Sequence, residues 1–187
     1  MKSCLKFFLI LLVGLAQLMP SVVSAREISS IEEVLNPAKL QGSGKLTWWG
    51  FHVYDASFYR SGNLSSPEFA LDLRYYKSFS GNAIANRSAE EMKKLGVPDA
   101  QAQAWGKQLA TFLPNVEPGQ NLTAIYIPKQ GTTFYFEGKP LAQIAGADFP
   151  KAFFGIWLDV KTSAPKLREQ LLSQNCPPPL FQEACNP

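Results

Sequence analysis

Strict alternation of apolar and polar residues over Phe69–Tyr76 (FALDLRYY) predicts a half-buried β-strand. The face expected to be buried carries Phe69, Leu71, Leu73 and Tyr75. The opposite face carries Asp72, Arg74 and Tyr76.

An earlier segment, Lys45–Tyr59 (KLTWWGFHVYDASFY), is rich in aromatic and β-branched residues and predicts a strand or a strand pair. A period of two places Trp49, Phe51 and Val53 on one face, and Trp48, His52 and Tyr54 on the other. Because both faces carry large rings, we expect a sheet that is covered at least in part on both sides.

The middle of the chain has helical spacing. Ser88 followed by Glu91 predicts a helix that begins in a capping box and ends at Gly96. A second helix is predicted to begin at Asp99 and to end near Pro114. Its apolar residues are expected to be core contacts: Ala102, Trp105, Leu109 and Phe112.

The last third predicts a hairpin of Leu122–Ile127 and Thr132–Phe136, followed by a short strand after Glu137-Gly138-Lys139. Phe149–Leu158 and Ala164–Leu172 predict two helices, the second capped by Ser163. Strands and helices grouped in this way indicate an α+β fold with an antiparallel sheet.

Residues 1–25 have the features of a secretory signal. Lys2 and Lys6 precede a nine-residue apolar run, residues 7–15, which is too short to span a bilayer. Small residues at 23–25 predict cleavage after Ala25, and a retained anchor is the alternative. No later segment is long and apolar enough to span a membrane. We therefore expect a periplasmic or secreted protein, and the short lysine-led signal is typical of bacteria.

The mature chain is expected to comprise one domain, residues 26–172, and a proline-rich tail, residues 173–187. A formal net charge of +3 for 187 residues is too small to predict a nucleic-acid partner. Protein partners and oligomeric state are left open by the sequence.

Cleavage would leave two of the three cysteines, Cys176 and Cys185, which predict a disulfide in an oxidising compartment. His52 is the only histidine of the chain, so the residues form no set of metal ligands. The sequence also has no glycine-rich phosphate loop, and we expect neither a metal nor another cofactor.

Two polar residues in the predicted strands have a structural and a functional interpretation. His52 is either a hydrogen-bonded structural histidine or a polar group that lines an apolar pocket. Arg74 either forms a surface ion pair, for example with Asp72, or receives a carboxylate or enolate oxygen at the mouth of a pocket.

Three blocks of sequence together resemble the chalcone isomerase-like family, and in particular its exported bacterial branch. The first is Gly42–Ala56 (GSGKLTWWGFHVYDA). The second is Phe69–Tyr76, continued by Phe79-Ser-Gly81 and Arg87–Met92. The third is Phe153–Asp159 (FFGIWLD), followed by Thr162–Pro165 and Leu167-Arg168. The resemblance extends over about Ile31–Leu172.

The resemblance implies an open-faced β-sandwich, in which a large antiparallel sheet carries a layer of helices and a ligand cleft lies between them. Plant members cyclise a chalcone with an arginine, polar hydroxyl groups, and a tyrosine and an asparagine on the cleft helix, whereas similar members bind fatty acids. Residues 36–45 of this chain contain no arginine, only Lys39 and Lys45. Ile84 and Glu91 align near the places of the tyrosine and the asparagine.

The sequence leaves three functions open. The first is binding of a small apolar or fatty-acid-like ligand in the cleft, with His52, Tyr54, Arg74 and Tyr76 as the binding residues. The second is an isomerase or intramolecular lyase that acts on an enone-like substrate, with Arg74 as oxyanion donor and Tyr54 or Tyr76 as proton donor. The third is an interaction module of the cell envelope that binds no ligand.

Overall fold

A six-stranded antiparallel sheet is the centre of the computed structural model, which describes residues 23–63 and 66–181. The strands follow one another in the sheet in the order of the chain. They are β1 (Ala38–Trp48), β2 (Phe51–Ser61), β3 (Phe69–Tyr75), β4 (Asn121–Ile127), β5 (Gly131–Phe136) and β6 (Lys139–Ile144). This topology confirms the predicted α+β fold with an antiparallel sheet.

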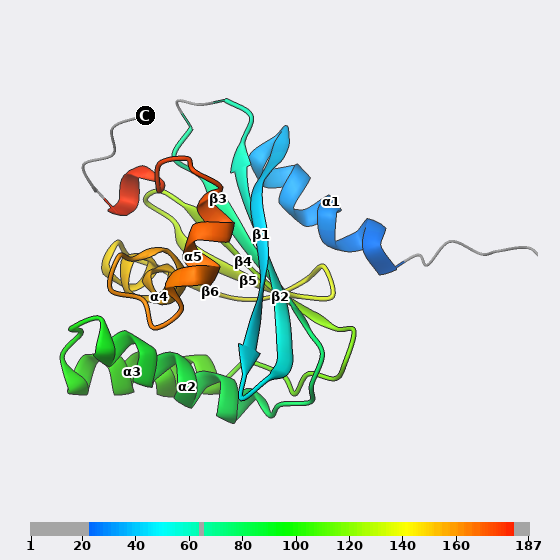
Figure 1. Cartoon of the computed structure of the whole chain (residues 1–187). Coiled ribbons are helices and arrows are strands. Elements are labelled where there is room, and N and C mark those ends of the chain that lie inside the picture. The colour runs from blue at the N-terminus through cyan, green and yellow to red at the C-terminus, as the bar shows by residue number, and fades with distance from the viewer. Residues whose placement is uncertain (1–22, 64–65, 182–187) are drawn as a thin grey trace, which may run out of the picture.

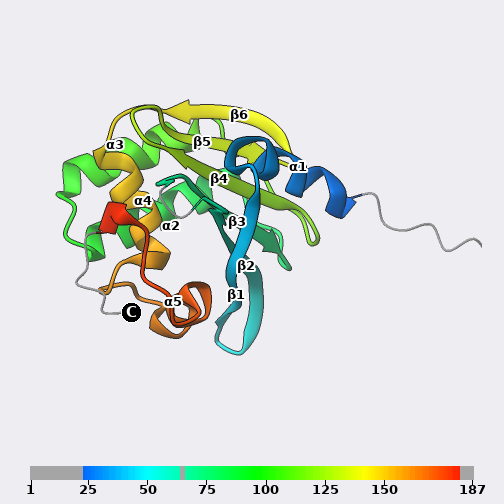
Figure 2. The same ribbon diagram turned by 90° about the horizontal axis from the view of Figure 1, so that it is seen from above.

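Helices lie on both sides of this sheet (Figures 1 and 2). The first side carries α2 (Gly81–Lys94), α3 (Asp99–Ala110), α4 (Asp148–Leu158) and α5 (Pro165–Leu172). The other side carries α1 (Val23–Leu35), which contacts β1, β2 and β4. The expectation of a sheet covered in part on both sides is therefore confirmed.

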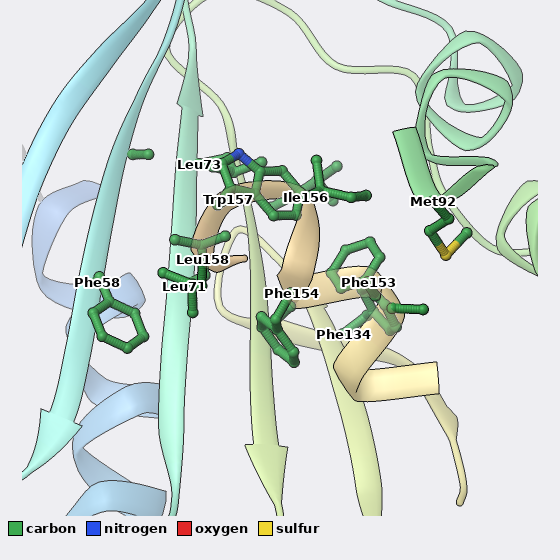
Figure 3. Close-up of a cluster of buried hydrophobic side chains, with 14 of the residues drawn as sticks. Phe58, Leu71, Leu73, Met92, Phe134, Phe153, Phe154, Ile156, Trp157 and Leu158 are labelled. Carbon is green, nitrogen blue, oxygen red and sulfur yellow. The ribbon is translucent and has the colours of Figure 1, made fainter. Parts of the chain in front are cut away.

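The main core lies between the sheet and the four helices (Figure 3). The predicted buried face of β3 faces this core, and Phe69 packs its ring edge against Phe154 of α4 at 4.7 Å between ring centres. The expected core residues of α3 also point into it: Ala102 and Leu109 are buried, and Trp105 and Phe112 are partly buried. A smaller core under α1 consists of Ile31, Leu35, Ala70 and Ile125.

The strand pair predicted over residues 45–59 is a hairpin whose first strand begins earlier, at Ala38. The start of β1 contains Gly42, and a Cβ atom there would lie 2.2 Å from the carbonyl oxygen of Gln170. Glycine thus permits the close packing of α5 on β1. Trp49 is not a strand residue, because it occupies the turn with φ of 50°; its predicted place on a strand face is wrong.

Two predicted helix caps are also wrong. Helix α2 begins at Gly81, because the Ser80 side chain accepts a hydrogen bond from the Ala83 amide at 3.1 Å. Ser88 lies inside that helix, where its hydroxyl donates to the Ile84 carbonyl. At α5 the Ser163 side chain does not cap the helix but donates to Glu91. The predicted end of α2 is confirmed by Gly96, which has φ of 95°.

The described part of the tail packs on the domain. It contains a short 3₁₀ helix, η1 (Pro179–Phe181), that contacts α4, and Phe181 is buried in the main core. Cys176 lies among the described residues, but Cys185 does not, so the disulfide stays a prediction. Most of the predicted signal, residues 1–22, also lies outside the described residues.

Candidate binding cavity

A cavity of about 740 Å³ lies between the sheet and helices α2, α4 and α5. Its size is within the range of about 300–1,000 Å³ that is typical of small-molecule sites. Most of its wall is made of apolar side chains from β2–β5 and the helices, which include Leu71, Leu73, Leu122, Ala124, Phe134, Phe153, Ile156 and Leu167. The interior is therefore suited to an apolar ligand.

The cavity opens where its lining residues are exposed, and we call these residues the mouth. They are Lys45, Thr47 and Trp48 of β1, Ala83 and Arg87 of α2, and Ser163, Pro165 and Lys166 around the start of α5. Three of the eight are cations, and none is an acid. The Arg87 guanidinium lies over the Trp48 ring at 5.1 Å from the ring centre, which joins α2 to β1 at the mouth.

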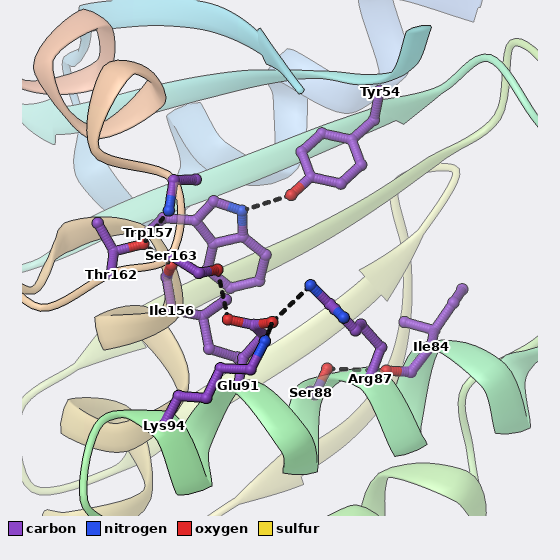
Figure 4. A network of polar contacts seen from close by, with 11 residues as sticks. Tyr54, Ile84, Arg87, Ser88, Glu91, Lys94, Ile156, Trp157, Thr162 and Ser163 are labelled. Atoms are coloured by element: carbon purple, nitrogen blue, oxygen red, sulfur yellow. Dashed lines mark hydrogen bonds and ion pairs between the residues drawn. The ribbon is translucent and has the colours of Figure 1, made fainter. Parts of the chain in front are cut away.

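Glu91 is a buried acid in the wall, only 5% exposed (Figure 4). Arg87 lies 2.6 Å and Lys94 2.8 Å from its carboxylate, and the Ser163 hydroxyl donates to it. Burial opposes ionisation, but the hydrogen bonds from Lys94 and Ser163 and the charges of Arg87 and Lys94 outweigh it and lower the pKa of Glu91. The carboxylate is thus ionised and compensated, and the mouth keeps a net positive charge.

Tyr54 provides a hydroxyl group on the wall of the cavity (Figure 4). Its oxygen accepts a hydrogen bond of 2.9 Å from the Trp157 indole nitrogen. Burial raises the pKa of Tyr54 to about 12, so the phenol keeps its proton at neutral pH. Within the part of the chain that the structure describes, no hydrogen bond uses that proton, so the hydroxyl can donate to a ligand.

Of the four residues expected to bind a ligand, the structure places only Tyr54 on the cavity. The other three lie together on the opposite side of the sheet. There His52 bonds to Asp55 at 2.8 Å and stacks on Tyr76 at 4.0 Å between ring centres. Arg74 lies opposite Asp55 in the neighbouring strand. The Tyr76 hydroxyl donates a hydrogen bond to the Asp55 carboxylate, and this bond, together with the negative charge of Asp55, raises the pKa of Tyr76.

A β-bulge explains why His52 and Tyr54 do not share a face. Leu46 pairs with Tyr54, but the next residue, Thr47, pairs with His52, so Val53 is the extra residue of the bulge. An extra residue reverses the alternation beyond it, which turns His52 away from the cavity. The prediction that Trp48, His52 and Tyr54 share a face is therefore wrong.

Sequence reasoning missed Arg87, Trp157 and Ser163 as site residues. The spacing of Arg87, Glu91 and Lys94 along one helix was the available signal, since residues three and four apart are neighbours. In contrast, Ile84 and Glu91, which were expected from the sequence to lie near cleft positions, both line the cavity. Among the described residues no group of three or more histidines, cysteines or acids is placed to hold a metal ion.

Comparisons with known proteins agree with this fold. The family model described as "Chalcone isomerase-like" matches residues 29–173. An uncharacterized protein of Haemophilus influenzae is 31% identical over 136 residues, which cover 71% of this chain and 67% of that protein. The crystal structure of a fatty-acid binding protein of Arabidopsis thaliana is similar with a TM-score of 0.56 and 14% identity, over 72% of this chain and 86% of that one.

The chain belongs to the chalcone isomerase-like family. The Arabidopsis structure has the same fold, an antiparallel sheet with a layer of helices. The described residues include no helix of the length and apolarity needed to cross a bilayer.

Proposed function

We propose that this protein binds a small ligand with an apolar chain and an acidic head group, a fatty acid or a similar acyl compound. The proposal rests mainly on the apolar cavity of about 740 Å³, whose exposed mouth contains Lys45, Arg87 and Lys166. An apolar chain gains about 0.8 kcal/mol for each methylene group that leaves water. The similarity in fold to the fatty-acid binding protein of Arabidopsis supports the same ligand class.

Arg87 is the head-group residue in this proposal. Its guanidinium has five N–H donors, and Glu91 uses only part of them. The Trp48 ring and the Glu91 carboxylate hold the guanidinium from two sides, so little side-chain entropy is lost when a carboxylate binds. The Tyr54 hydroxyl is a second donor for a ligand oxygen inside the cavity.

Binding is tested by titration of palmitic acid and of hexadecanol, which has the same chain without the charge. We expect micromolar or tighter affinity for the acid and at least tenfold weaker affinity for the alcohol, the difference that one charge-assisted hydrogen bond makes. Equal affinities for the acid and the alcohol would contradict a role of the mouth in binding the head group. If neither ligand binds, the proposed function is wrong.

The enone isomerase alternative needs Arg74 as oxyanion donor and Tyr54 or Tyr76 as proton donor, and of these three residues only Tyr54 lines the cavity. Arg74 and Tyr76 lie on the opposite side of the sheet from the cavity, so Arg74 cannot serve there as oxyanion donor beside Tyr54. We therefore do not propose an isomerase with that set of residues. The ligand-free interaction module is disfavoured by the large apolar cavity, because an apolar space of this size costs packing energy when nothing fills it.

We also propose that the protein is exported and that Cys176 and Cys185 form a disulfide. The basic and apolar pattern of residues 1–25 and the paired cysteines of the tail support this. A ten-residue loop closed by a disulfide contributes about 2–3 kcal/mol in the chain-entropy model. The intact mass of protein from the periplasmic fraction should correspond to residues 26–187 less two hydrogens. The mass of the uncleaved chain would contradict export with cleavage after Ala25. Two free thiols would contradict the disulfide.

A further inference from the structure

The turn between β1 and β2 exposes large aromatic rings to solvent. Trp49 is 85% exposed and Phe51 64%, and the preceding Trp48 is 53% exposed. We call Trp49, Gly50 and Phe51 the hairpin tip. In Figure 1 the tip lies at the end of the sheet next to α2. Rings of this size normally leave water on folding, so their exposure here indicates a surface that meets another apolar phase.

The backbone of the turn strengthens this argument. Trp49 has φ of 50° and Gly50 has φ of 79°. Two-residue turns with positive φ at both positions strongly prefer Asn-Gly or Asp-Gly, because a bulky side chain is disfavoured there. The chain thus holds a tryptophan at a position where turn chemistry favours a small polar residue, and packing inside the molecule does not explain it, since the ring is exposed.

The charge around the hairpin tip is positive. Lys77 lies 5.7 Å from the centre of the Phe51 ring, and Arg87 covers the Trp48 ring. Lys45 is the only charged residue of segment 45–54. Asp55, the acid that follows this segment, bonds to His52. A partner with negative charge and an apolar layer beneath it complements this surface.

We infer that the hairpin tip docks on the surface of an anionic lipid bilayer. Tryptophan is enriched at membrane interfaces, where its ring lies at the level of the head groups. Basic residues near the surface each contribute about 1 kcal/mol of attraction to anionic lipid. A protein partner would need an acidic apolar groove of matching shape, whereas a bilayer offers both properties without a specific shape.

Docking in this way brings the mouth of the cavity to the bilayer, because Trp48 belongs to the mouth and directly precedes the tip. If the proposed acyl ligand is right, its chain passes between membrane and cavity with little exposure to water. That consequence depends on the proposed function, but the docking itself does not, since Trp49 and Phe51 do not line the cavity.

Vesicle sedimentation tests the docking. The double variant W49N/F51T removes both exposed rings. Asparagine tolerates the positive φ of position 49, and threonine suits the strand at position 51. The control variant L40T/V160T removes two other exposed apolar side chains, which are 55% and 65% exposed and lie outside the tip. All proteins are used in the form recovered from cells, with identical ends, and their melting temperatures are compared.

We expect the wild type and the control to sediment with phosphatidylglycerol vesicles, less so in high salt, and only weakly with phosphatidylcholine. The W49N/F51T variant should bind at least tenfold more weakly while it keeps its affinity for soluble palmitic acid. Unchanged vesicle binding by W49N/F51T would overturn the inference. The inference would also be overturned if the wild type were a dimer, the W49N/F51T variant were a monomer and neither protein bound vesicles. The hairpin tip would then contact a second copy of the chain.

Discussion

The Trp157 indole nitrogen donates a hydrogen bond of 2.9 Å to the Tyr54 hydroxyl oxygen, and this bond joins α4 to β2 in the wall of the cavity. The two residues are 103 positions apart in the chain. Because the indole has only a donor, the bond occupies the oxygen of Tyr54 and leaves its proton directed to other acceptors. The tryptophan thereby fixes the phenol as a donor group of the cavity.

Tyr54→Phe tests this relationship. The variant leaves the buried Trp157 N–H without its acceptor, so we expect a loss of about 1 kcal/mol in stability, or roughly 2–4 °C in melting temperature. Affinity for palmitic acid should fall about three- to tenfold, as for one neutral hydrogen bond. Tyr76→Phe, on the opposite side of the sheet, is the control and should bind normally. Calorimetry measures both, and equal effects of the two variants would contradict the assignment.

Arg87→Met tests the head-group contact and keeps much of the length of the side chain. We expect affinity for palmitic acid to fall about 10- to 100-fold, the value of a hydrogen bond to a charged group. Affinity for hexadecanol should change little, since its head is neutral. Arg74→Met is the matched control, because Arg74 lies outside the cavity. If Arg74→Met weakens binding and Arg87→Met does not, the cavity described here is not the binding site.

Glu91 makes stability depend on pH in the acid range. Its pKa is lowered in the folded protein, so its stabilisation is present above the ordinary value of 4.5 and is lost as pH falls through the lower folded pKa. We expect Glu91→Gln to cost about 1–3 kcal/mol at neutral pH, and its difference from wild type to shrink below about pH 4. Urea unfolding at several pH values measures this difference.

Glu90→Gln is the control for that series. Glu90 is 59% exposed and pairs with Lys93 on the surface of the same helix, so its loss should change stability little at any pH. If the difference in unfolding free energy between wild type and Glu91→Gln stays constant from pH 7 to pH 3, the ionised carboxylate contributes nothing to stability beyond packing.

Ala124→Leu tests whether the acyl chain occupies the inner part of the cavity. Ala124 belongs to β4 and lines the cavity wall, so the larger side chain takes space from the far end of a long ligand. If two methylene groups lose their place, binding weakens by about 1.6 kcal/mol, or roughly tenfold. We therefore expect weaker binding of palmitic acid and unchanged binding of decanoic acid. Competition with a fluorescent fatty acid measures the two affinities, and equal losses for both acids would contradict a chain seated along β4.

Much of the fold could be predicted because its signals are local. The alternation in β3 and the hairpin of β4 and β5 follow from a period of two within a few residues. The helical spacing of α3 and α4 identified both helices. The start of β1 was missed because Gly42 and Gly44 give no strand pattern, and the packing of α5 that requires glycine there comes from residues far along the chain.

The site was harder to predict because long-range contacts decide it. Ser163 binds Glu91 across 72 positions, so two residues that fit helix caps in the sequence are partners of each other in the structure. The bulge at Val53 reverses the strand alternation and separates His52 from Tyr54. A bulge depends on the register with the neighbouring strand, and no pattern within β2 reveals it.

Native mass spectrometry of the protein, purified without detergent and then mixed with palmitic acid, tests the central claim most directly. The account predicts a complex of one chain with one acyl ligand, either carried from the cell or formed with the added acid, and an Arg87→Met variant that needs about 10- to 100-fold more acid to form it. A bare chain at every concentration of added acid, with no rise in melting temperature, would contradict it.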